Sequence, residues 1–149
     1  MGAGAVSPQR PVAADGKVPL GFDEIAGRLK TLDLPDVDVV YAIATGGVVP
    51  GALAAYKLGV PLRRLDINYR APDNSPQRPG PELLAPADIP QQGTRVLLVD
   101  DVSVTGKTMD FARSLLVGCQ VTTLALKGRA ADYVLFPEVS SCVVWPWNP

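Results

Sequence analysis

The sequence has no histidine and only two cysteines, and these absences narrow the chemistry that the protein can perform. Without histidine, a Ser-His-Asp triad, a Cys-His pair and histidine-based metal sites are all excluded. Cys119 and Cys142 are too few for a structural zinc site. One pair of cysteines in a chain of otherwise ordinary composition favours reduced thiols in the cytoplasm.

Long hydrophobic runs and an excess of charge of one sign are also missing. No apolar run approaches the length of a membrane span, and the amino terminus lacks the hydrophobic core of a signal peptide. The formal net charge is −1 at pH 7, so no basic field would attract nucleic acid or a membrane surface. We therefore expect a soluble, cytoplasmic protein, and 149 residues suit one domain with a sizeable core.

The most informative stretch is residues 95–109, Arg-Val-Leu-Leu-Val-Asp-Asp-Val-Ser-Val-Thr-Gly-Lys-Thr-Met. Its apolar run, 96–99, predicts a buried strand, and two carboxylates, Asp100 and Asp101, follow at the carboxyl end. A loop of small residues then enters a helix at about Lys107. Ligands of open α/β sheets bind beyond the carboxyl ends of the strands, and a helix start offers unpaired backbone N–H groups. The stretch therefore predicts a phosphate cradle with two acids beside it.

Two other motifs share features with this stretch. A Walker A loop also contains Gly-Lys-Thr, but it requires a glycine five positions before Gly106, and that position is Asp101. A phosphoacceptor receiver domain has paired acids after a strand, but near the start of its chain rather than late in it. Carboxylates accept hydrogen bonds and so suit vicinal hydroxyls, which favours a sugar that carries a phosphate.

A second strand-loop-helix unit has similar features. Residues 37–44 predict a strand, which leads into Thr45-Gly46-Gly47 and then into a helix that we expect to begin at about Ala52. The glycines let the backbone approach a ligand closely, so this loop is a second candidate anion site. The remaining pattern predicts a helix at 22–32 and strands at 62–69, 120–126, 133–136 and 142–145.

Two segments show no clear periodicity. Residues 1–20 are rich in Gly, Ala and Pro, and we expect a flexible amino-terminal arm there. Residues 70–93 are rich in proline, and a loop of this length in a compact domain is usually functional or disordered. The expected organisation is thus one domain, residues 21–149, with a flexible loop at about 70–93.

Three runs resemble the type I phosphoribosyltransferases, which bind phosphoribosyl pyrophosphate (PRPP). The run 96–108 resembles the family signature, and the run 44–53, Ala-Thr-Gly-Gly-Val-Val-Pro-Gly-Ala-Leu, is similar to the pyrophosphate loop of xanthine-guanine phosphoribosyltransferase. The run 124–148 looks like the base-binding end of small prokaryotic purine phosphoribosyltransferases. The resemblance implies a Rossmann-like parallel sheet flanked by helices, with a small hood built from the termini.

The resemblance also implies roles for individual residues. The catalytic acids are Asp100 and Asp101, which hold the ribose hydroxyls. The other implied contacts are those to the 5′-phosphate by Ser103, Val104, Thr105, Gly106, Lys107 and Thr108, those to pyrophosphate by Thr45, Gly46 and Gly47, and those to the base by Lys127, Val143 and Trp145. No direct metal ligand is implied, because Mg²⁺ arrives bound to PRPP. The long loop closes over the site, where Arg70 and Arg78 are candidate contacts to pyrophosphate.

Three positions depart from the family pattern. Thr45 stands where an arginine is common, Val104 where 6-oxopurine enzymes carry an Asp that handles the N7 proton, and Cys142 where an aromatic residue stacks on the base. Two functions stay open. The chain is an enzyme that makes a nucleoside monophosphate from PRPP and a purine in purine salvage, or it is a weak or inactive regulatory module that binds PRPP or a nucleotide. We favour the enzyme, as a homodimer or homotetramer by analogy with the family.

Overall fold

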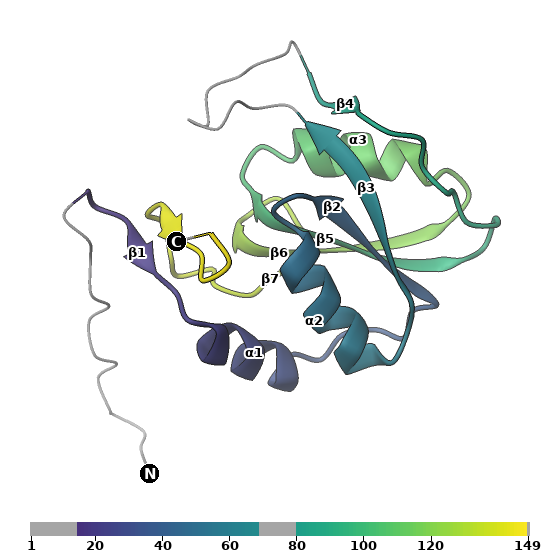
Figure 1. The fold of residues 1–149 in the computed structure, drawn as a ribbon. Coiled ribbons are helices and arrows are strands. Elements are labelled where there is room, and N and C mark those ends of the chain that lie inside the picture. Colours follow the sequence, from purple (N-terminus) through teal and green to yellow (C-terminus); the bar gives the residue numbers. More distant parts are fainter. Residues whose placement is uncertain (1–14, 69–79, 149) are drawn as a thin grey trace.

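A computed structural model of the chain describes residues 15–68 and 80–148, which contain three helices and eight strands (Figure 1). The helices are α1 (Phe22–Thr31), α2 (Val48–Leu58) and α3 (Lys107–Leu115). The strands are β1 (Val18–Pro19), β2 (Val39–Ala44), β3 (Leu62–Asn68), β4 (Glu82–Leu83), β5 (Arg95–Ser103), β6 (Gln120–Gly128), β7 (Tyr133–Val134) and β8 (Val143–Val144).

The main sheet has six strands in the order β4-β3-β2-β5-β6-β7. Its neighbouring strands are parallel, except that β4 runs antiparallel to β3. Helices α1 and α2 cover one face and α3 the other (Figure 1). The expected fold class, α/β with a mostly parallel sheet between helices, is confirmed.

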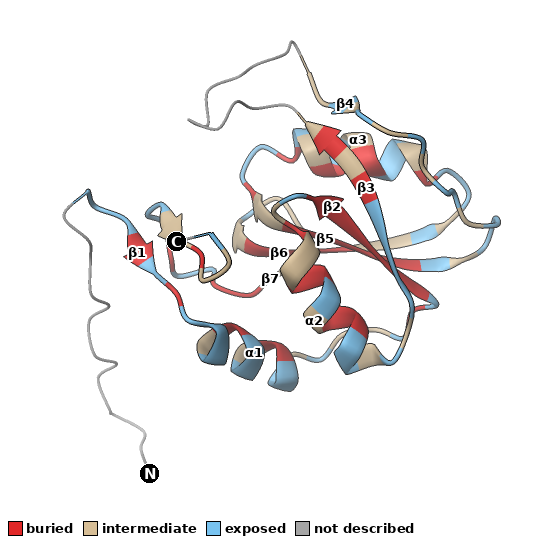
Figure 2. Ribbon diagram, in the orientation of Figure 1, coloured by how far each residue is buried: buried red, intermediate tan, exposed pale blue. Residues whose placement is uncertain are grey.

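The alternation of side chains along the central strands divides the core into two parts. In β5, Leu97 and Val99 pack with α1 and α2, whereas Val96 and Leu98 pack with α3. Successive side chains of a strand point to opposite faces, so a strand that is buried on both faces reads as a continuous apolar run. Figure 2 shows the result as a buried centre in β2 and β5.

Two element boundaries differ from the sequence prediction. Strand β5 extends to Ser103 rather than ending at Val99, because its polar end continues to pair with β6, with Asp100 beside Ala125. Helix α2 begins at Val48 rather than at Ala52. Proline is compatible with the first turn of a helix, so Pro50 does not delay that start.

The predicted hood is present as a parallel pair between β1 and β8. The expectation of a loosely packed arm up to residue 20 is wrong for its last residues, because Val18 and Leu20 are buried in the core. Both lie beside the carboxyl-terminal strand, where the backbone N–H of Val18 donates to the Cys142 carbonyl (2.8 Å). Residues 1–14 lie outside the described part of the chain.

The predicted long loop is partly structured. Strand β4 pairs antiparallel with the end of β3, and Leu83 and Ala87 pack against the core on the α3 face. Arg70 and Arg78 lie outside the described residues. In the parts of the chain that the structure describes, no helix is both long and apolar enough to cross a membrane.

Candidate active site

The two acids of the central motif lie at the carboxyl end of β5. Asp100 is buried and Asp101 half-buried. The N–H of Asp101 donates to Asp100 Oδ1 (2.8 Å), and the N–H of Val102 donates to Asp101 Oδ1 (2.8 Å). Burial raises the pKa of Asp100 well above its ordinary value, and the neighbouring charge of Asp101 raises it further. Asp101, the more exposed of the two, is the one that a ligand can reach.

The glycine loop after β2 lies directly against these acids. A β-carbon added at Gly46 would lie 2.5 Å from the Asp101 Cγ, and one added at Gly47 would lie 2.4 Å from the Val99 carbonyl oxygen. A side chain at Gly46 would displace the Asp101 carboxyl group, and one at Gly47 would displace the backbone of β5 or β2. The glycine loop and the two acids, predicted from separate stretches of sequence, therefore meet at one edge of the sheet. Thr45 is exposed there, and the Ala44–Thr45 peptide bond is cis.

The loop between β5 and α3 is the segment in which the sequence predicts an anion cradle. Gly106 adopts a left-handed φ of +83°, which favours glycine, and the chain then turns into α3. Thr105 Oγ1 accepts a hydrogen bond from the N–H of Lys107 (3.4 Å). Val104, Thr105 and Lys107 are exposed and Thr108 is half-buried, so this loop and the first turn of the helix face solvent. Amides in such a first turn have no partner within the helix.

Ser103 has a different environment from the rest of that loop. Its side chain is buried and its hydroxyl donates to the Ala130 carbonyl (2.7 Å). Its carbonyl accepts from the N–H groups of Arg129 (2.9 Å) and Ala130 (3.0 Å). At Gly128, where φ is +107°, an added β-carbon would lie 2.1 Å from this carbonyl oxygen. The Ser103 hydroxyl therefore holds the loop against the segment that follows β6 and does not face solvent.

Sequence reasoning missed Gly128 and Ala130 as supports of the loop. The only sequence signal was a glycine directly after Lys127, which allows a close approach of two backbones. The approach itself depends on the pairing of β5 with β6, in which Ser103 lies beside Gly128.

The candidate base-binding residues are distributed over two sheets. Lys127 is half-buried on β6, beside Val102 of β5. Val143 lies on β8, where the carbonyls of its neighbours Cys142 and Val144 accept hydrogen bonds from the N–H groups of Val18 (2.8 Å) and of Leu20, the residue after β1 (3.2 Å). Since successive carbonyls of a strand point to opposite sides, that of Val143 points away from β1. Val102 and Val143 pack against the same hydrophobic cluster.

Trp145 is a core residue. It is 7% exposed, and its ring stacks on that of Trp147 at a centroid distance of 5.2 Å and an interplanar angle of 5°. Phe22 of α1 packs against Trp147 in turn (6.0 Å). The indole of Trp145 therefore has little surface left for a base. Tyr133 is half-buried and Cys142 is exposed.

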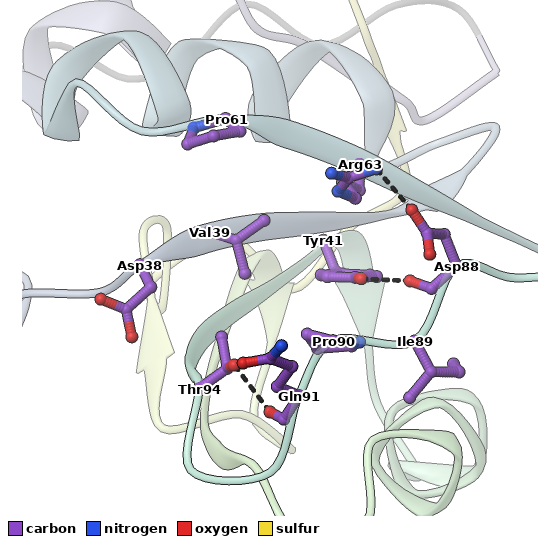
Figure 3. Close-up of a pocket in the computed structure, with 10 residues that line it drawn as sticks. All are labelled: Asp38, Val39, Tyr41, Pro61, Arg63, Asp88, Ile89, Pro90, Gln91 and Thr94. Atoms are coloured by element: carbon purple, nitrogen blue, oxygen red, sulfur yellow. Dashed lines mark hydrogen bonds and ion pairs between the residues drawn. The ribbon is translucent and has the colours of Figure 1, made fainter.

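A cavity of about 310 Å³ lies elsewhere, toward the amino ends of the strands (Figure 3). Asp38, Pro61 and Thr94, which directly precede β2, β3 and β5, line it. Its polar groups already have partners, as between Arg63 and Asp88 (2.6 Å) and between the Thr94 hydroxyl and the Gln91 carbonyl (2.6 Å). This cavity is separate from the candidate active site.

Carboxylate oxygens suit Mg²⁺, and the candidate site offers those of Asp100 and Asp101. Within residues 15–68 and 80–148, no third acid, histidine or cysteine joins them in a group that could hold a metal ion.

Comparison with known proteins covers nearly all of the described chain. The phosphoribosyl transferase domain family matches residues 20–145. An adenine phosphoribosyltransferase from Corynebacterium jeikeium is 31% identical over 82% of this chain and 70% of that protein. Another, from Nitrosospira multiformis, is 36% identical over 67% of this chain and 61% of that protein. A xanthine-guanine phosphoribosyltransferase from Idiomarina loihiensis is 26% identical over 73% of this chain and 70% of that protein.

The fold comparison agrees. The purine phosphoribosyltransferase from Pyrococcus horikoshii has a TM-score of 0.70 and 25% identity to this chain, and the match covers 89% of this chain and 95% of that one. The sheet, its flanking helices and the hood are therefore those of the expected fold.

Proposed function

Because the chain belongs to the phosphoribosyl transferase domain family, as its sequence motifs predict, we propose that it transfers the phosphoribosyl group of PRPP to a purine base. The products are a nucleoside monophosphate and pyrophosphate, as purine salvage requires. The observation that carries this proposal is the contact between Gly46 and Asp101, which joins the glycine loop to the acids at one edge of the sheet. Pyrophosphate and ribose are adjacent in PRPP, so their binding groups must be adjacent too.

PRPP lies across the carboxyl ends of β2 and β5 in this proposal. Asp101 accepts hydrogen bonds from the ribose hydroxyls. Asp100 assists it, because a raised pKa favours the protonated form of Asp100 and leaves its neighbour as the acceptor. The backbone of residues 104–108 surrounds the 5′-phosphate at the start of α3, and residues 45–47 bind pyrophosphate.

The chemistry needs no nucleophile from the protein. Positive charge develops on the sugar as pyrophosphate leaves, and the Asp101 carboxylate beside the ribose stabilises it electrostatically. Mg²⁺ bound to PRPP would neutralise the leaving group. Asp100 and Asp101 would hold this ion, either through their own oxygens or through water molecules bound to it.

The purine binds between Lys127 and the hood. The Lys127 ammonium group can only donate hydrogen bonds, so it recognises an acceptor on the base, and the Val143 backbone reads a second edge. Val104 cannot move a proton, so proton transfer at N7 is left to solvent or to the substrate itself. Trp145 contributes by supporting the hood rather than by stacking on the base, given its burial.

The decisive experiment measures pyrophosphate release from PRPP and Mg²⁺ with adenine, hypoxanthine, guanine or xanthine, alongside calorimetry of PRPP binding to the same sample. We expect release with at least one base, which would also identify the substrate. PRPP binding without release for any base would overturn the enzyme in favour of the regulatory module. A protein that neither binds nor turns over PRPP would refute the site itself.

Location and assembly belong to the same proposal. We propose a cytoplasmic enzyme, consistent with the two free cysteines, Cys119 and Cys142. We also propose a homodimer or homotetramer, which light scattering of the purified protein tests.

A further inference from the structure

Helix α1 carries one side chain that reaches across to the segment after β7. Arg28 Nη1 donates to the Leu135 carbonyl (2.9 Å) and to Glu138 Oε1 (2.9 Å), and Nη2 donates to the other oxygen of the same carboxylate. The guanidinium carbon also lies 4.1 Å from the ring centroid of Phe136, which is fully buried. One arginine thus makes three kinds of contact with residues 135–138.

This segment leads directly to the hood, which we define as β1, β8 and residues 145–148. Residues 135–142 connect β7 to β8, so the position of residue 138 constrains where β8 begins. The other end of the hood is attached to the same helix, because β1 ends two residues before Gly21, the N-cap of α1. Phe22, the first residue of α1, packs on Trp147 of the hood.

Helix α1 therefore holds the hood at two points that are six residues apart. Its buried side chains, Ile25 and Leu29, fix the helix itself in the core. Phe22 contacts the aromatic turn of the hood, and Arg28 fastens the segment that enters it. Removal of the second contact would leave the hood held by the β1–β8 pairing, by Phe22 on Trp147 and by its own buried residues, without the side-chain contacts from α1 to residues 135–138.

We infer that Arg28 is a positioning residue for the purine, acting through the hood. This inference rests on the proposed function, in which the Val143 backbone of β8 reads the base. The PRPP groups, by contrast, lie on β2, β5 and α3, which Arg28 does not contact in any of its described interactions. Loss of the Arg28 contacts should therefore weaken recognition of the purine and leave that of PRPP intact.

Only arginine can make this set of contacts. Its planar guanidinium binds both oxygens of a carboxylate, reaches a carbonyl with a further N–H and stacks on an aromatic ring. Lysine keeps the charge but presents a single ammonium group. Arg28→Lys is thus the informative variant, because it preserves the net charge and the helix propensity of α1 while removing the forked geometry.

The chain supplies a matched control. Arg95 also binds both oxygens of one carboxylate, that of Asp38 (2.8 and 3.3 Å), but at the amino end of β5. Arg95→Lys removes the same type of contact away from the hood. Both variants should lose a similar, small amount of stability, since each loses one partly exposed ion pair.

The test compares steady-state kinetics of the wild type, Arg28→Lys and Arg95→Lys, with the purine and PRPP varied separately. We expect Arg28→Lys to raise KM for the purine about tenfold and to change KM for PRPP less than about twofold, while Arg95→Lys changes neither. Glu138→Gln, which keeps the size of the side chain but loses the charge, should reproduce a smaller rise. If Arg28→Lys does not fold, the KM of Glu138→Gln for the purine tests the inference in its place.

Three results would overturn the inference: an unchanged KM for the purine, equal rises in both KM values, or the same changes in Arg95→Lys. Each would reduce Arg28 to a general stabilising contact. These results differ from a failure of the proposed function, which shows as a wild type that is inactive with every base. In that case calorimetry of nucleoside monophosphate binding supplies the readout, with weaker nucleotide binding and unchanged PRPP binding expected for Arg28→Lys.

Discussion

At the amino end of the main sheet opposite charges are paired, whereas at its carboxyl end two like charges stand side by side. Asp38 pairs with Arg95, and the Arg63–Asp88 pair lies at the cavity of Figure 3. At the other end, Asp100 is buried next to Asp101, and Gly46 leaves no space for a side chain. At the amino end each of these charges has a partner of opposite sign, which favours stability. At the carboxyl end two like charges are adjacent and one of them is buried, which costs stability and is common at functional sites.

The pKa shifts of the aspartates at the two ends have opposite directions. Hydrogen bonds from Arg95 lower the pKa of Asp38 to about 2, whereas burial raises that of Asp100. A carboxylate with a lowered pKa stabilises the folded state once it is ionised, and one with a raised pKa destabilises it. The comparison teaches that the chain accepts a cost in stability at the edge where PRPP is proposed to bind. The following predictions test it.

The largest effect is expected at Asp101. Asp101→Asn keeps an oxygen that can accept from the Val102 N–H but removes the charge that we propose binds the ribose, so PRPP affinity should fall about 100-fold or more, as measured by calorimetry. Thermal unfolding should show no loss of stability. Asp38→Asn is the control from the opposite end, where stability should fall and PRPP affinity stay the same. Equal PRPP affinity in the wild type and Asp101→Asn would remove the distinction between the two ends.

A smaller loss is expected at Gly46. Its substitution by alanine places a methyl group against the Asp101 carboxyl group and should weaken PRPP binding about tenfold, because the carboxylate must move. Gly27 of α1 is the matched control, since no atom lies within 4 Å of its added β-carbon. Gly27→Ala should instead stabilise the helix by about 0.5–1 kcal/mol and leave binding intact. Tight PRPP binding by Gly46→Ala would show that the contact is not part of the site.

The pH dependence of stability should separate the two ends by sign. Asp38 contributes stability above its ordinary pKa of 3.8, and this is lost as the pH falls through about 2, so the deficit of Asp38→Asn should disappear over that window. Asp100 has a raised pKa, so its penalty is absent below 3.8 and grows as the pH rises. Asp100→Asn should therefore gain stability relative to the wild type from pH 4 upward. Urea unfolding across pH 2–7 measures both, and parallel curves for the two variants would contradict the assignment.

The smallest effect is expected at Tyr41, whose buried hydroxyl donates to the Asp88 carbonyl above the cavity of Figure 3. Burial also raises the pKa of this phenol. Tyr41→Phe leaves the carbonyl without that donor and should cost about 1 kcal/mol in urea unfolding. PRPP affinity should not change. A change in affinity would mean that the cavity is coupled to the active site.

The sequence predicted the centre of this protein better than its edges. The run Val96–Val99 and the glycines at 46 and 47 carry local signals, and the structure has the first in a buried strand and the second in the turn between β2 and α2. The end of β5 was missed because its residues are polar, and only the pairing with β6 keeps them in a strand. The strand at Val18 was missed because its pairing partner lies at the far end of the chain.

The site shows the same division between local and non-local information. The turn at Gly106 before α3 follows from residue types that are adjacent in sequence. The roles of Ser103 and Trp145 do not, because each is decided by a partner from another strand or turn, Ala130 for the one and Trp147 for the other. Arg28 carried no signal at all, since a basic residue near the end of an amphipathic helix is ordinary.

The pairing of β1 with β8 has a consequence for the order in which the protein is made. The residues that form the proposed PRPP site, up to Lys107 and Thr108, leave the ribosome well before Val143 and Val144. The pairing of β1 with β8 closes the longest loop among the described strand pairs. A contact between residues so far apart in sequence has a large entropic cost and forms slowly. Of the described strands, β8 is therefore the last to be synthesised, and its pairing with β1 is the last strand pairing that can form.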